Sequence, residues 1–89
     1  MMNLEQKPLF KRTYKKIYKN QRPQVNSAIK VIVADPLIGE EKKGDLAGVR
    51  VYKFDIQNQL YLLAYTVDET TITLLALGVY ENFYRELKK

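Results

Sequence analysis

The chain has 89 residues, enough for one domain, because a core of this size buries only about two-thirds of the surface that the unfolded chain exposes. We therefore expect residues 1–89 to form a single domain. A composition of 46% hydrophobic and 28% charged residues is globular and excludes a disordered regulator. The sequence contains no cysteine and no histidine, which excludes disulfide scaffolds, thiolate nucleophiles and Cys/His zinc sites. Any catalysis must use Lys, Arg, Tyr, Asp or Glu.

The charge of the chain is +5 and is unevenly distributed. Residues 1–30 carry eight basic side chains against Glu5 alone, a local charge of +7, so the remaining residues sum to −2. A basic segment of this density favours an anionic partner, either nucleic acid or an acidic protein segment. A solvated basic helix face is the simpler alternative.

No stretch approaches the roughly 18 uncharged apolar residues that a membrane span needs. The N-terminal residues also lack the apolar region of a signal peptide. We expect a cytoplasmic protein with no membrane partner.

The first third of the chain has helical periodicity. From residue 7 to residue 20 the apolar side chains recur at helical spacing, with Pro8 suited to the first turn. A second helix follows the break at residues 20–23 and stops at Asp35-Pro36. Together they predict an amphipathic helical hairpin. Residues 3–6 have little β character, so support for a strand before Pro8 is weak.

Residues 36–48 contain a proline, three glycines and the run Glu40-Glu41-Lys42-Lys43, which predicts a connecting loop. Residues 49–56 then alternate between an aromatic, apolar face and a face bearing Lys53 and Asp55, as a half-buried strand does. Residues 57–59 can turn this strand into a hairpin.

Residues 60–67 and 71–80 are apolar on both faces and predict central strands, with Asp68-Glu69 as the turn between them. The i, i+4 pair of Phe83 and Leu87 predicts a short C-terminal helix. The predicted fold class is α+β, with the N-terminal helical hairpin packed on one face of a small, mainly antiparallel sheet.

Three segments, residues 42–54, 60–65 and 75–87, resemble the RelE/ParE toxin superfamily of bacterial type II toxin–antitoxin systems. The resemblance implies a RelE-like fold and a cognate antitoxin protein as partner. Members of the superfamily are either ribosome-dependent mRNA endonucleases or inhibitors of DNA gyrase. We expect the first activity, with ribosome and mRNA as partners and translation as the inhibited process. The alternatives are a non-enzymatic ParE-like gyrase inhibitor and a catalytically weakened homologue.

The endonuclease members cleave mRNA by attack of the RNA 2′-hydroxyl on the adjacent phosphate, which requires no metal ion and no cofactor. The reaction needs a proton acceptor for the hydroxyl, positive charge beside the phosphate and a proton donor for the leaving 5′-oxygen. By resemblance, Lys53 and Arg85 neutralise the phosphate, while Tyr80 and Glu81 occupy positions of proton-transfer groups. Tyr84 keeps an aromatic position that can stack on a base.

The sequence departs from the superfamily at several positions. RelE has a second lysine where this chain has Asp55, and it has arginines at the positions of Leu62 and Tyr80. Other members have a histidine where this chain has Tyr80. A phenol, with an ordinary pKa of about 10, is a poor proton acceptor at pH 7 but can donate a proton or orient a phosphate.

Further basic residues are candidates for RNA binding: Lys43, Arg50, Lys11, Lys15, Lys16 and Lys19, the last four expected on the outward face of one helix. Simpler structural roles remain open. Lys53 could pair with Asp55, and Arg85 could pair with Glu81. Tyr80 could belong to the core, Tyr84 could pack the terminal helix, and Arg50 and Lys43 could be plain surface residues.

Overall fold

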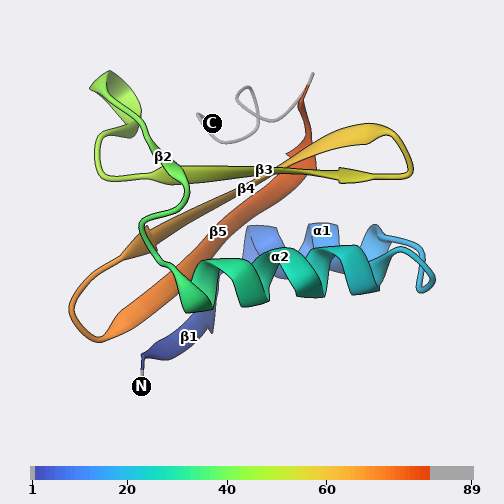
Figure 1. Ribbon diagram of the computed structural model, residues 1–89, viewed down its shortest axis with the longest axis horizontal. Coiled ribbons are helices and arrows are strands. Elements are labelled where there is room, and N and C mark those ends of the chain that lie inside the picture. Colours follow the sequence, from blue (N-terminus) through green and yellow to red (C-terminus); the bar gives the residue numbers. More distant parts are fainter. Residues whose placement is uncertain (1, 81–89) are drawn as a thin grey trace.

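The computed structural model describes residues 2–80, which form a five-stranded mixed sheet with two helices on one face (Figure 1). The elements in chain order are β1 (Asn3–Gln6), α1 (Pro8–Lys16), α2 (Arg22–Ala34), β2 (Glu40–Glu41), a single 3₁₀ turn (Gly44–Leu46), β3 (Arg50–Ile56), β4 (Gln59–Val67) and β5 (Thr71–Val79). Among these residues no helix is long and apolar enough to cross a membrane. The predicted C-terminal helix lies outside the described residues.

The chain opens with a strand, not with the expected helical hairpin. The sheet order is β1-β5-β4-β3-β2, and β1 runs parallel to β5 while the other neighbours are antiparallel. Backbone hydrogen bonds extend this pairing beyond the strand, from Asn3 N to Thr70 O (2.8 Å) and from Lys7 N to Leu74 O (2.9 Å). All four β1 side chains are exposed. Pairing with a distant strand therefore imposes an extended conformation on a segment with little β propensity of its own.

The first helix is shorter than predicted. It ends at Lys16, because Ile17 adopts an extended conformation with φ −72° and ψ 134°. The side chain of Arg22, at the start of α2, donates hydrogen bonds to the carbonyls of Lys15 (3.1 Å) and Ile17 (3.2 Å), which the helix leaves without intrahelical partners. The expectation that Lys19 shares a helix face with the α1 lysines is wrong, because Lys19 lies in the connection to α2.

The segment predicted to be a loop contains strand β2. Glu40 pairs with Val51 and Glu41 with Arg50, and Lys42 N donates to Val49 O at 2.8 Å. Two residues are too few to show alternation in a sequence. β2 therefore pairs only with the first two residues of β3.

Both turns of the predicted meander are confirmed. Gln57 and Asn58 have φ values of 49° and 69°, so both central residues of the β3–β4 hairpin are left-handed, as a type I′ turn requires. Between β4 and β5, an Asp68 carboxylate oxygen accepts backbone hydrogen bonds from Thr70 and Thr71, both at 2.8 Å. These two N–H groups lower the pKa of Asp68.

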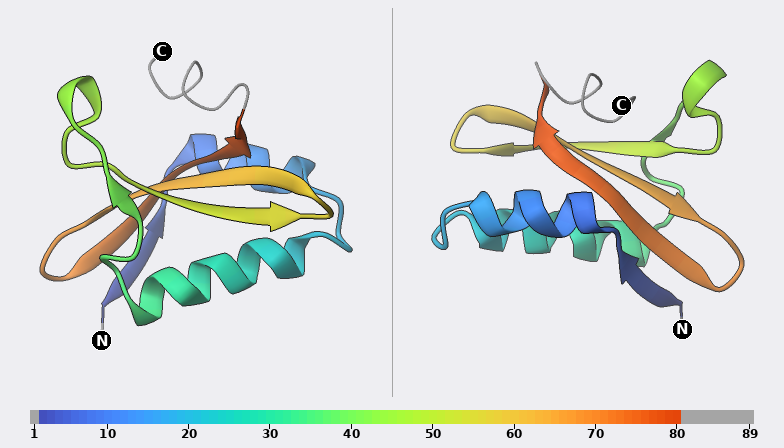
Figure 2. Two further views of the ribbon diagram at one scale, coloured as in Figure 1. Left: turned by 45° about the horizontal axis from the view of Figure 1, so that its top comes forward. Right: turned by 180° about the vertical axis from the view of Figure 1, so that it is seen from behind.

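The main core lies between the helices and one face of the sheet (Figure 2). Its fully buried large side chains come from α1, α2 and the strands, and include Phe10, Ile32, Leu63, Tyr65 and Ile72. The aromatic face of β3 turns toward this core, as the alternation predicts. A second cluster of Val51, Leu62, Ala64 and Ala76 lies on the opposite face. We call that opposite face the helix-free face.

Candidate functional site

Strand β3 carries Lys53 and Asp55 on the helix-free face, and both side chains are exposed. The register aligns Lys53 with Leu62 on β4, and Leu62 with Gly78 on β5. Leu62 is fully buried and Gly78 has no side chain, so β4 and β5 place no polar side chain beside Lys53 in this row. The cation of this row therefore lies at its β3 end.

Strand β2 adds a carboxylate to the same face. Because Glu40 pairs with Val51, its side chain lies on the helix-free face, diagonal to Lys53. Its Oε1 atom is 2.5 Å from Lys42 Nζ. The hydrogen bond and charge of Lys42, with a smaller contribution from the charge of Lys53, lower the pKa of Glu40. The sequence predicts a loop for this run of charges and so does not single out Glu40 and Lys42, and a two-residue strand leaves no alternation that could have identified them.

Tyr80 follows directly after β5 and is 50% exposed. It lies two residues beyond Gly78, which belongs to the row of Lys53. Neighbouring strands are about 4.8 Å apart, so β3 and β5 are separated by roughly 10 Å. Continued by one residue, the β4–β5 register aligns Tyr80 with Leu60, and Leu60 aligns with Asp55, so Tyr80 lies one row beyond Lys53 with β4 between them.

Arg50 does not belong to this face. Its Nη1 atom donates hydrogen bonds to the carbonyls of Leu37 (3.1 Å) and Gly39 (2.8 Å), and its Nη2 atom is 3.6 Å from Glu41 Oε1. The guanidinium therefore joins the segment before β2 to the start of β3.

The remaining predicted RNA-binding residues are dispersed. Lys43 is exposed just before the 3₁₀ turn. Lys11, Lys15 and Lys16 are exposed on α1, on the opposite side of the sheet from Lys53, because α1 packs on the core face. Glu81, Tyr84 and Arg85 lie outside the described residues. In the part that the structure describes, no group of three or more acidic residues could hold a metal ion.

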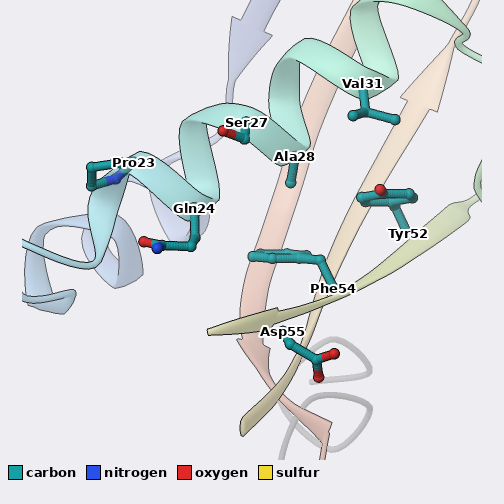
Figure 3. A pocket seen from close by; sticks show the side chains of 8 residues that line it. All are labelled: Pro23, Gln24, Ser27, Ala28, Val31, Tyr52, Phe54 and Asp55. Atoms are coloured by element: carbon teal, nitrogen blue, oxygen red, sulfur yellow. The ribbon is translucent and has the colours of Figure 1, made fainter. Parts of the chain in front are cut away.

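A groove of about 290 Å³ separates α2 from β3 (Figure 3). Tyr52 and Phe54 point from β3 toward Ala28 and Val31 of α2, and their rings stack with centroids 6.2 Å apart. Asp55 lies at the margin, on the other side of the strand. Since β2 pairs only with Arg50 and Val51, the outer edge of β3 beside this groove has no strand neighbour within residues 2–80.

Several solved structures are similar to this chain. The E. coli RelBE toxin–antitoxin complex contains a chain that is 19% identical, with a TM-score of 0.68, over 88% of this chain and 95% of that one. E. coli YafQ is 11% identical, with a TM-score of 0.70, over 91% and 96%. The Staphylococcus aureus YoeB dimer is 26% identical, with a TM-score of 0.63, over 84% and 92%. These likenesses confirm the α+β class and the RelE-like fold.

No curated protein sequence is significantly similar to this chain. Residues 4–88 match the family model of the ParE-like toxins of type II bacterial toxin–antitoxin systems. This match spans nearly the whole chain and agrees with the structural neighbours. The chain therefore belongs to the ParE-like toxin family, within the RelE/ParE superfamily of type II toxin–antitoxin toxins.

Proposed function

We propose that this toxin is a metal-independent endoribonuclease that cleaves mRNA on the ribosome. The supporting observation is that Lys53 and two carboxylates lie on β2 and β3 of the helix-free face, and that the half-exposed Tyr80 directly follows β5, which only β4 separates from β3. A cation beside proton-accepting and proton-donating groups is what phosphodiester cleavage by an internal hydroxyl needs.

In the proposed reaction the Lys53 ammonium contacts a non-bridging phosphate oxygen and stabilises the charge that develops in the transition state. The RNA 2′-oxygen loses its proton to Glu40 or Asp55, the carboxylates that flank Lys53, and forms a bond to phosphorus. The bond from phosphorus to the 5′-oxygen breaks, and the Tyr80 hydroxyl gives that oxygen a proton. The products are a 2′,3′-cyclic phosphate and a 5′-hydroxyl. Arg85, assigned by resemblance, supplies a second positive charge.

The variants Tyr80→His and Tyr80→Phe test this assignment. Histidine supplies an imidazole that titrates near neutral pH, so cleavage should rise, within the roughly 10² to 10⁴ that acid–base groups contribute. Phenylalanine keeps the ring and removes the hydroxyl, so cleavage should fall while the melting temperature barely changes. Primer extension on translating ribosomes measures the cleavage, and thermal unfolding is the control.

A gyrase supercoiling assay on the same three proteins distinguishes the alternative. The chain has Leu62 and Tyr80 where RelE has arginines, and these missing cations favour the alternative, a non-enzymatic gyrase inhibitor. If the native chain and both Tyr80 variants cleave mRNA equally and all three inhibit gyrase, the nuclease proposal is contradicted and the gyrase inhibitor is supported.

We further propose that the cognate antitoxin docks an acidic segment in the α2–β3 groove, as a helix in the groove or as a strand on the free edge of β3. The stacked Tyr52 and Phe54 provide an apolar floor, and the chain carries a charge of +5. Ser27→Arg should block the groove, whereas Ala34→Arg, on exposed α2 surface outside it, should not. Calorimetry with the purified antitoxin should give submicromolar binding, about −8 kcal/mol or better, abolished only in Ser27→Arg.

A further inference from the structure

We propose that Tyr65 and Arg50 are positioning residues that clamp the segment Pro36–Gly39, and that this clamp holds β2 so that Glu40 faces Lys53. We call these contacts the Tyr65–Arg50 clamp. Its catalytic consequence rests on the proposed nuclease function, but its structural consequence does not.

Tyr65 lies on β4 with its ring in the main core and is fully buried. Its hydroxyl donates a hydrogen bond to Pro36 O at 2.7 Å and accepts one from Gly39 N at 2.9 Å. Burial raises the pKa of Tyr65, the largest effect on it, so the hydroxyl keeps its proton at neutral pH and remains a donor. One phenol oxygen therefore satisfies two backbone groups, at both ends of the segment.

Arg50 holds the same segment from the neighbouring strand. Its guanidinium donates to the carbonyls of Leu37 and Gly39 and reaches Glu41, the second residue of β2. A planar guanidinium with several fixed donors suits this task, whereas a lysine ammonium on a flexible stem does not. This role explains why the Arg50 side chain is only 20% exposed.

The clamp matters because β2 is too short to hold its own position. Only Glu40 and Glu41 pair with β3, and so short a strand pairing is marginal in isolation. The residue before β2 is Gly39, which both clamp residues contact. A released Gly39 would let Glu40 leave its place diagonal to Lys53, and the site would lose a carboxylate without any change to a reacting group.

The test uses Tyr65→Phe, which removes the hydroxyl alone. Tyr61→Phe is the matched control, because Tyr61 lies on the same strand, its ring contacts Phe54 and it lies outside the clamp. Hydrogen exchange at the Lys42 amide, which bonds Val49 O, should become about tenfold faster in Tyr65→Phe than in the control.

A second measurement follows the Glu40 carboxyl by NMR titration, with and without Lys53→Met. Replacing Lys53 should raise the pKa of Glu40 in the otherwise native chain and in Tyr61→Phe, and have a smaller effect in Tyr65→Phe. If Tyr65→Phe proves too unstable to study, Arg50→Lys keeps the charge, breaks the planar fork and should give the same two responses. Unchanged Lys42 exchange and an unchanged Glu40 response would overturn the clamp. Neither measurement involves RNA, so they are independent of whether the native chain cleaves mRNA.

Discussion

Gly39→Ala should be among the most damaging single-methyl additions to this protein. Gly39 is buried, and a Cβ atom there would lie 2.7 Å from Tyr65 Oη, 2.8 Å from Cε1 and 3.1 Å from Cζ. Real Cβ atoms do not approach other atoms within 3.0 Å, so the ring or the segment must move. The Tyr65 ring is fully buried among packed side chains and has little room to do so.

The magnitude follows from two separate costs. Overpacking a tight site costs about 1–3 kcal/mol. Moving the ring also breaks the 2.9 Å hydrogen bond to Gly39 N, and a buried N–H without a partner costs about 1–3 kcal/mol. We expect the free energy of unfolding to fall by roughly 2–5 kcal/mol. For a domain of this size that lowers the melting temperature by at least about 8 °C.

Urea titration followed by circular dichroism measures the decrease in stability. The control is Gly48→Ala, where φ is +88° and a Cβ would meet nothing within 4 Å, so only the backbone conformation costs about 1–2 kcal/mol. In a Tyr65→Phe background the atom 2.7 Å away is gone but Cε1 remains, so Gly39→Ala should cost less without becoming neutral. The reasoning fails if Gly39→Ala is no more destabilising than Gly48→Ala, or if its cost is the same in both backgrounds.

Three further outcomes are expected. Burial raises the pKa of Tyr65 in the folded state, so the Tyr65 hydroxyl stabilises the fold fully below about pH 10 and less as the pH rises through the folded pKa. In urea titrations, the difference in unfolding free energy between the native chain and Tyr65→Phe should therefore become smaller above about pH 10. The pKa of Asp68 is lowered in the folded state, so this carboxylate stabilises the fold above pH 3.8 and stops doing so as the pH falls through the lower folded pKa. When the pH is lowered below about 4, the melting temperature of Asp68→Ala should therefore decrease less than that of the native chain. An equal decrease in both proteins would exclude Asp68 as a cause of the acid destabilisation. The third outcome concerns four N-terminal lysines replaced together by glutamine: Lys11, Lys15, Lys16 and Lys19. The slope of log affinity for ribosomes against log salt concentration should decrease by about 0.7 to 0.9 for each phosphate that a lysine no longer neutralises. An unchanged slope would show that these lysines only keep the protein in solution.

The sequence predicts an element correctly where the residues of that one segment repeat at helical or strand spacing. Helical spacing of apolar residues predicts α1 and α2, and Pro8 and Pro23 both occupy first turns. Alternation predicts that Lys53 and Asp55 face away from the aromatic side of β3, and the turns at residues 57–58 and 68–69 follow from their residues. The resemblance to the RelE/ParE superfamily, confirmed by the family match, was also available from the sequence.

Only the tertiary structure decides which distant segments meet. β1 and β2 are short, exposed strands whose pairing is imposed by β5 and β3, so their residues carry no periodic signal. The same pairing brings Glu40 beside Lys53 and gives Arg50 a structural task, while α1 packing directs the basic helix to the opposite side of the sheet. Side-chain chemistry is written in the sequence, but the face that a residue occupies depends on strand register, and register is set by contacts between residues far apart in the chain.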